Sequence, residues 1–322
     1  MSQTYLRRFD GRLSVVLICL WLCFGAMPTQ AQPDGLAATL EVLTAGVEVR
    51  RIDTVNWIAV AVESIIGTGD SIRTDETGRA RITYFGDGTD VVLEPNTEYR
   101  IDAFRGSDTD FTIQAQVVVG QTIQRIGRLL SGGSSYELIT PAMTLAARGT
   151  IFDISVQDSG RSAILVREGE VVASDEGETA PVPSGFGVRA DVEGELSDVV
   201  RAETFAQLDA ALDGCTASAT ITDDLSFNVR IAPSLDAPRV GTLLVTDLDL
   251  AYGVTASGWY RIGFRGGFGW VRTSALVIDA NCAGLRLFPD DQEPEDATLY
   301  ESLGDAVSLD DLGVDPTPTP QS

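Results

Sequence analysis

Residues 140–156 read TPAMTLAARGTIFDISV, and this stretch decides the fold class. Pro141 has no backbone donor, and Gly149 allows a positive φ angle. Between them, the run Ala142–Ala147 has no polar residue except Thr144, and the residues that follow, Ile151–Val156, alternate in character. This pattern predicts a buried strand, a turn and a second strand. We therefore expect the chain around it to be β-rich.

Short alternating segments separated by Gly and Asp turns recur on both sides of this stretch. Examples are Ser71–Thr74 and Arg79–Phe85 before it, and 163–166 and 170–173 after it. A repeat of strand plus turn every 8–12 residues or so is typical of a sandwich or meander. The sequence thus predicts one all-β domain over residues 36–200. Residues 120–130 fit a strand, but their apolar spacing leaves a helical alternative open.

The pattern changes after residue 200. Ala202–Leu212 lacks Gly and Pro and spaces its apolar residues by three and four, which predicts a short helix in a linker over residues 201–214. Five to six short strands then follow within residues 215–282, as in a small barrel. Cys215 and Cys282 bracket this segment and predict a disulfide, with two separate buried thiols as the alternative.

The two ends of the chain differ from the parts between them. Three arginines, the apolar run Leu13–Ala26 and small residues before Gln32 predict a signal peptide over residues 1–31, cleaved after Ala31. An uncleaved anchor is the alternative, and only then would the protein contact the membrane. Residues 283–322 are acidic, contain Pro and Thr, and hold no EF-hand loop, so we expect a disordered tail. The predicted location is the periplasm, the cell envelope or the medium.

Composition excludes several function classes. The net charge is −24, all 23 basic residues are Arg, and His is absent. An acidic chain does not bind nucleic-acid phosphates non-specifically. Without His or Lys, the triads and dyads of hydrolases and the usual metal sites cannot form. We therefore expect no catalytic residue, no metal and no cofactor; a carboxylate-based glycan hydrolase remains as a remote alternative.

Several motifs over about residues 40–173 resemble the FecR domain. They are GDSIRT at 69–74, DGT at 87–89, YELITP at 136–141, RGT at 148–150 and VREGEV at 166–171. The resemblance implies an exported all-β domain, best known from the periplasmic half of regulators that relay an outer-membrane transport signal to an extracytoplasmic sigma factor. Those regulators carry an anti-sigma segment before their membrane helix. Since about 12 residues precede the apolar run here, we expect no such segment.

Within the FecR-like motifs, Thr140, Pro141, Arg148, Gly149 and Thr150 are expected to be structural. Arg148 could be interpreted as an anion site, but an Arg beside Gly-Thr is expected to pair with a turn carboxylate. The stretch then serves as the crossing that holds the sheets together.

Residues 215–282 resemble the bacterial Src-homology-3 domain, on FNVRIAPS at 227–234, GWYRI at 258–262 and GWV at 269–271. The resemblance implies a binding module for cell-wall polymer or for proteins outside the membrane. Trp259 and Tyr260 are neighbours on a predicted strand and point to opposite faces, so one of them could bind a ligand. Arg230 could reach a partner's carboxylate or brace the loop before Pro233.

These observations predict a non-catalytic exported protein that binds or scaffolds cell-wall polymer or an extracellular or periplasmic protein. The alternative is a FecR-type signal-transduction component that keeps its N-terminal anchor.

Overall fold

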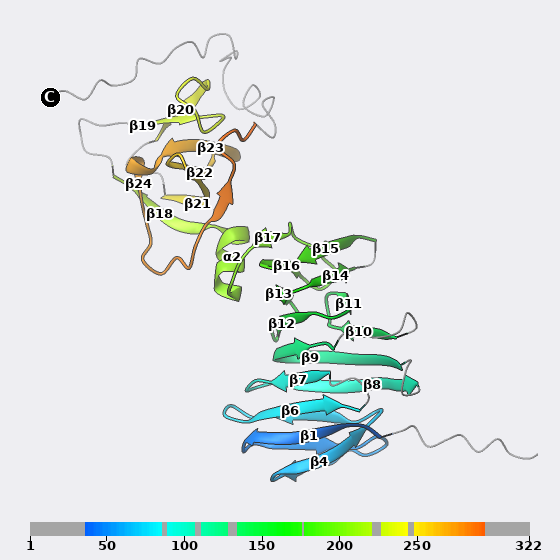
Figure 1. Cartoon of the computed structure of the whole chain (residues 1–322). Helices are drawn as coiled ribbons and strands as arrows, with labels where there is room; N and C mark the ends of the chain where they lie inside the picture. The colour runs from blue at the N-terminus through cyan, green and yellow to red at the C-terminus, as the bar shows by residue number, and fades with distance from the viewer. Residues whose placement is uncertain are drawn as a thin grey trace, which may run out of the picture. The chain divides into compact units, whose positions relative to one another are not determined.

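The computed structural model describes residues 36–85, 89–106, 111–127, 134–175, 177–220, 227–243 and 248–293. These residues form strands almost throughout, with one short α-helix, as the sequence predicts (Figure 1). The predicted signal peptide, the GDG turn at 86–88 and most of the predicted acidic tail lie outside the described residues.

Residues 36–201 form two sheets that pack as a sandwich, called sheet A and sheet B below. In spatial order, sheet A contains β4 (Glu63–Gly67), β1 (Leu36–Thr44), β6 (Arg79–Tyr84), β7 (Asp90–Leu93), part of β9 (Phe111–Arg125), β12 (Ile151–Val156), β13 (Ser162–Glu168), β16 (Phe186–Ala190) and β17 (Val200–Arg201). Sheet B contains β3 (Trp57–Val60), β2 (Val47–Arg50), β5 (Ser71–Thr74), β8 (Glu98–Gly106), part of β9, β10 (Ser135–Ile139), β11 (Thr144–Ala147), β14 (Glu170–Ser174) and β15 (Thr179–Pro183). Figure 1 shows these strands stacked one above the next.

Strand β9 belongs to both sheets. Its first part pairs with β8 and β10 in sheet B, and the part from Gly120 onward pairs with β7 and β12 in sheet A. Gly120 has a φ of +99°, which only glycine adopts readily, and a Cβ there would lie 2.4 Å from the Thr97 hydroxyl oxygen. The helical alternative for residues 120–130 is therefore wrong for 120–125. Residues 128–130 lie outside the described part.

The core lies between the two sheets. Burial alternates along many of the strands, as in β6, β10 and β14, and residues from both sheets join one apolar cluster, for example Ile82 and Phe152 from sheet A and Ile72 and Leu138 from sheet B. This is the period of two that the sequence shows. The stretch 140–156 crosses between the layers, because β11 lies in sheet B and β12 in sheet A.

Helix α2 (Phe205–Asp213) covers the outer face of sheet A. The side chain of Thr204 caps its first turn by accepting a hydrogen bond from the Gln207 backbone N–H at 3.2 Å. Leu208 and Ala211 pack on Ala163 and Leu165 of β13. The helix was expected as a linker, and it also shields β13, which is why five consecutive residues of that strand are buried.

The C-terminal strands form a single sheet with its own core. The order is β20 (Arg239–Leu243), β19 (Phe227–Arg230), β23 (Gly267–Arg272), β22 (Trp259–Phe264), β21 (Leu248–Thr255), β18 (Cys215–Ala219) and β24 (Leu276–Ile278), with β25 (Arg286–Phe288) parallel to β21. The predicted small barrel does not close: among the described residues β20 and β24 do not pair. Strand β24 has three residues, and all of them pair with β18.

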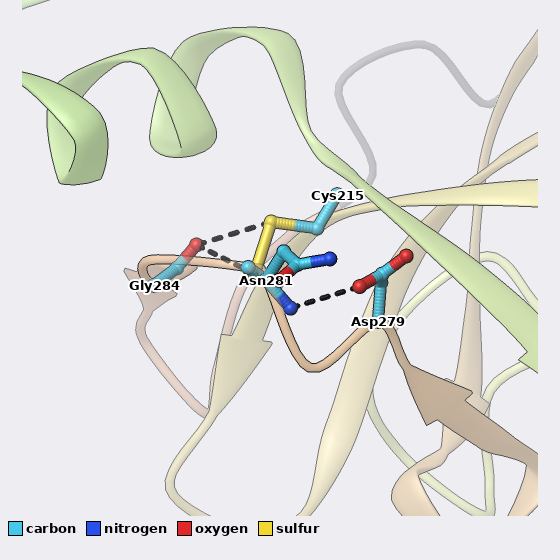
Figure 2. Close-up of a disulfide and its surroundings, with 5 residues drawn as sticks. Cys215, Asp279, Asn281 and Gly284 are labelled. Atoms are coloured by element: carbon cyan, nitrogen blue, oxygen red, sulfur yellow. Dashed lines mark hydrogen bonds between the residues drawn. A yellow bond between two sulfur atoms is a disulfide. The ribbon is translucent and has the colours of Figure 1, made fainter.

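A disulfide joins Cys215 to Cys282, as the even cysteine pair predicts. The Cα atoms are 5.7 Å apart, which is ordinary for such a bond. Figure 2 shows the disulfide at Cys215 beside a turn in which the Asp279 carboxylate accepts from the Asn281 backbone N–H, at 2.8 Å. The bond ties β18 to the segment after β24.

Candidate functional site

A groove lies on the sandwich beside the Thr140–Pro141 turn. It has a volume of about 680 Å³. Three segments that are far apart in sequence line it: residues 140–144, the end of β14 at Ser174 and Asp175, and the turn 192–195. We call it the TP groove. Sequence analysis treated Thr140 and Pro141 as structural, and the structure places them in its wall.

The Thr140–Thr144 wall is held by a compact turn. The Thr140 hydroxyl is buried; it accepts from the Met143 backbone N–H at 3.0 Å and lies 2.9 Å from the Met143 carbonyl oxygen. The Met143 side chain packs in the sandwich core, and Pro141 is exposed. The wall is therefore rigid on its inner side and presents Pro141 outward.

The opposite wall is a five-residue loop, residues 191–195, anchored at both ends. Ala190 bridges Leu196, and Glu193 adopts a φ of +60°. Asp191 accepts from the Arg161 guanidinium at 2.6 Å, and this hydrogen bond lowers the pKa of the Asp191 carboxyl. The ion pair fixes the loop to β13.

Gly160 allows these two walls to approach. It has a φ of +85°, and a Cβ at this position would lie 2.5 Å from Cγ2 of Val192 and 3.3 Å from Cβ of Pro141. Any other residue would therefore push Val192 away. The turn Asp158–Gly160 thus helps to set the width of the TP groove.

The charge of the TP groove is one-sided. Asp175, Glu193 and Glu195 line it, and the described lining contains no Arg. Its other surface comes from Pro141, Ala142, Met143 and Val192. Acidic residues beside apolar ones suit a cationic, partly apolar segment. The described lining contains no Cys, and the chain has no His and no Lys.

The second half of the motif lies at the other end of β11. Gly149 has a φ of +63°, and Thr150 contacts the turn at Gly169, where a Cβ would lie 2.8 Å from the Thr150 methyl. Arg148 is exposed, and Thr150 is buried. The turn RGT therefore packs against the turn of VREGEV. The first half of the motif lines the TP groove, and the second half joins two turns of the sandwich.

A smaller cavity of about 270 Å³ lies on the outer face of sheet A beside α2. Asp153 lines it; one of its carboxylate oxygens accepts from the Arg167 guanidinium at 2.8 Å, and the other is buried without a hydrogen-bond partner. Among the described residues, no group of three or more His, Cys, Asp or Glu could hold a metal ion.

The residues predicted to bind a ligand in the C-terminal sheet occupy three different environments. Trp259 is buried with Trp270 and Phe288 in a small aromatic cluster. Arg230 is also buried and donates to the Ala237 carbonyl at 2.6 Å, so it braces the loop around Pro233. Tyr260 is half-buried on the opposite face of β22. The structure therefore does not bring the three side chains together, and of the two aromatic residues only Tyr260 keeps an accessible edge.

Part of the sandwich is similar to a known protein family. Residues 70–172 match the family model described as FecR protein, and this match spans β10, β11 and most of β14 at the TP groove. Two crystal structures of a proposed anti-sigma factor from Parabacteroides distasonis ATCC 8503, at 1.65 and 2.50 Å resolution, align with 18% identity and a TM-score of 0.36. Each alignment covers 51% of this chain and 68% of that one. No curated protein matches the sequence. The resemblance of residues 215–282 to a Src-homology-3 domain stays a prediction.

Sequence reasoning missed the TP groove because its acidic wall lies outside the motif. Residues 192–195 follow the FecR-matched span and read as an ordinary polar turn. The pairing of Arg161 with Asp191 joins residues 30 positions apart, which no local pattern reveals.

Proposed function

We propose that this protein is a non-catalytic component of envelope signal transduction, in which the FecR-like sandwich receives a partner protein. The match of residues 70–172 to the FecR protein family supports this proposal best. Within the described residues, no helix is long and apolar enough to span a membrane. The proposed location is the cell envelope, reached through the N-terminal segment.

The TP groove is the proposed contact site on the sandwich. Its three carboxylates face a rigid, partly apolar wall, and the described lining has no basic residue to neutralise them. A partner segment with Arg or Lys beside small apolar residues would complement it in charge and shape. The partner is thus proposed to be an extracytoplasmic protein with a basic exposed loop.

Deletion and complementation in the bacterial host test the signalling role. We expect deletion to change transcription of the genes under an extracytoplasmic sigma factor, and the wild-type gene to restore it. A variant with Asp175→Asn, Glu193→Gln and Glu195→Gln should fail to restore it, because the charge of the TP groove is removed. Transcript levels are the measurement.

A matched control removes three exposed carboxylates elsewhere: Glu63→Gln, Glu76→Gln and Asp236→Asn. This variant should complement like the wild type. Unchanged transcription after deletion would contradict the signalling role. Equal complementation by both triple variants would leave the role intact and remove the TP groove from it.

A second candidate is a scaffold that binds cell-wall polymer through the C-terminal sheet. The partly accessible ring of Tyr260, which packs against the main apolar cluster of the C-terminal sheet, favours it, because an aromatic face can stack on a sugar or peptide. Retention of the full chain on purified cell wall, compared between wild type and Tyr260→Ala, is the test. No retention of the wild type would remove this candidate.

The N-terminus separates two versions of the signalling proposal. Mass spectrometry of the exported protein should find a mature start at Gln32 if the signal peptide is cleaved. A retained N-terminal segment would instead favour a membrane-anchored sensor. The absence of His and Lys supports a regulatory rather than an enzymatic role in both versions.

A further inference from the structure

The two sheets of the sandwich end in four edge strands, and three of them are blocked against pairing with another strand. In β15, Pro181 and Pro183 stand at paired positions opposite Val172 and Glu170, and neither proline can donate a backbone hydrogen bond. At one end of sheet A, edge strand β17 has only two residues. Short strands and prolines are two common ways to protect an edge.

Edge strand β4 is blocked by an arginine. The Arg51 guanidinium donates to the Ile65 carbonyl and to the Ser64 hydroxyl, both at 2.8 Å, and is held by Asp70 at 2.6 Å. The Arg51 side chain thus already hydrogen-bonds the Ile65 carbonyl, which an added strand would need as an acceptor. A charged group on the edge also disfavours a second chain.

Strand β3 is the fourth edge, and it carries no such protection. In the described residues it pairs only with β2. Residues 54–62 read TVNWIAVAV and contain no charge and no proline, in a chain with 70 charged residues (23 Lys plus Arg and 47 Asp plus Glu). Val55, Ile58 and Val62 are 87%, 56% and 70% exposed. An uncharged apolar edge is a ready template for another strand.

The edge is also held in a fixed conformation. Trp57 lies against two guanidinium groups, at 4.7 Å from Arg50 and 4.3 Å from Arg73. Each arginine is paired with a carboxylate, Arg50 with Glu98 and Arg73 with Glu48. A strand that is already ordered loses little conformational entropy when it pairs.

We propose that β3 is a self-association edge, on which a second copy of this chain adds its own β3 in antiparallel order across a two-fold axis. The charge pattern is compatible with a second copy at this edge. Two chains of charge −24 repel each other, and Asp53 and Glu63 flank the uncharged residues 54–62, but β3 itself carries no charge and the arginines against Trp57 are paired within the chain, so repulsion is weak where the two strands meet.

The two-fold axis restricts the register. Residues opposite each other in an antiparallel pair share a face, so a symmetric pair must place one residue opposite itself. With Ala59 at the axis, Ile58 faces Val60 of the other copy, and Trp57 faces Ala61. Ile58 and Val60 stand beside the buried Val49 and Val47, so this register extends the core face of sheet B. The large Trp57 then meets a small residue.

Cross-linking tests this register on the exported chain purified from its host. Facing Cα atoms in an antiparallel pair are about 4.5–5.5 Å apart, within the range that a disulfide spans. We expect Ala59→Cys to give a disulfide-linked dimer on mild oxidation. Wild type and Val277→Cys, an exposed position on the C-terminal sheet, are the controls and should stay unlinked.

Sedimentation velocity tests the association itself. The wild type should dimerise between about 1 and 100 µM, and Ile58→Lys should weaken the dimer about tenfold or more, because a buried edge lysine is disfavoured. Val62→Lys, at an exposed position beyond the strand, should weaken it less. A wild type that stays monomeric at about 100 µM would overturn the proposal. A dimer insensitive to Ile58→Lys, with no cross-link at Ala59, would overturn it equally.

Discussion

The sandwich and the C-terminal sheet achieve stability in different ways. The sandwich buries one continuous apolar cluster between two layers, and its described residues include no disulfide. The C-terminal sheet is open, splits its apolar residues into two smaller clusters, and has the Cys215–Cys282 disulfide. Small domains bury too little surface to rely on their core alone. In this chain, the region with the smaller apolar clusters is therefore the one that carries the covalent link.

Removal of a core side chain from the sandwich should have the largest effect. Phe152 is fully buried at the point where β12 pairs with β9 and β13. Phe152→Ala is expected to cost about 3–5 kcal/mol of unfolding free energy, through lost burial and the cavity left behind. Urea unfolding followed by hydrogen exchange should show loss of protection in the sandwich and little change in the C-terminal sheet. Phe268→Ala, on a more exposed ring, is the matched control.

Loss of the disulfide should destabilise the C-terminal sheet and leave the sandwich largely unchanged. The bond closes a loop of 67 positions, and the double variant Cys215→Ser and Cys282→Ser should destabilise the C-terminal sheet by about 2–4 kcal/mol. Trp259 and Trp270 lie in that sheet and Trp57 lies in the sandwich, so tryptophan fluorescence in a Trp57→Phe background reports the unfolding of the C-terminal sheet. The sandwich should keep its own transition. Equal destabilisation of both regions would show that their stabilities are coupled.

The sandwich core also contains a row of hydrogen-bonded tyrosine hydroxyls, called the tyrosine chain below. The Tyr99 hydroxyl lies 2.9 Å from that of Tyr84 and 3.5 Å from that of Tyr136, and Tyr136 donates to Gln124 at 2.7 Å. Burial raises the pKa of the Tyr84 and Tyr99 hydroxyls, so both stay neutral.

Tyr99→Phe removes the middle of this chain and leaves its neighbours with unmet hydrogen bonds. The expected cost is about 1–3 kcal/mol, measured by urea unfolding. Tyr260→Phe in the C-terminal sheet should change stability by less than about 0.5 kcal/mol, because that ring is half-exposed. If the Tyr99→Phe variant has the same unfolding free energy as the wild type, the tyrosine chain adds no stability.

Local patterns were enough to predict the strands of the sandwich. The alternation in Ile151–Val156 and the turn at Gly149 are visible in the sequence because they depend on neighbours along the chain. The double role of β9 was not visible, since its bend at Gly120 depends on the close approach of Thr97. The open C-terminal sheet was also missed, because strand pairing between distant segments leaves no local signal.

The candidate site was even less predictable than the fold. The TP groove needs Asp175, Glu193 and the Thr140 turn side by side, and each alone looks like a turn. By contrast, the pattern around Trp259 and Arg230 suggested a binding face, and both side chains are buried. Aromatic and arginine residues stabilise small sheets as readily as they bind ligands.

The smallest expected effect is the change in unfolding free energy with pH that comes from two ion pairs of the sandwich. Hydrogen bonds from Arg189 and Arg161 lower the pKa values of Asp213 and Asp191, respectively. A carboxyl with a lower pKa in the folded state stabilises the fold above its unfolded pKa, about 3.9, and this stabilisation is lost as the pH falls through the folded value. Because both carboxylates are largely exposed, each pair should contribute only about 0.2–1 kcal/mol.

The double variant Asp191→Asn and Asp213→Asn should therefore be less stable than the wild type at pH 7, measured by urea unfolding. The difference should shrink as the pH falls below about 3.9, because protonation removes the same charges from the wild type. The C-terminal sheet provides an internal comparison, since Asp290 also has a lowered pKa, caused by the Ser257 backbone N–H. Its acid response should be the same in the variant and the wild type. A stability difference that persists at low pH would show that Arg161 and Arg189 hold their loops by packing rather than by charge.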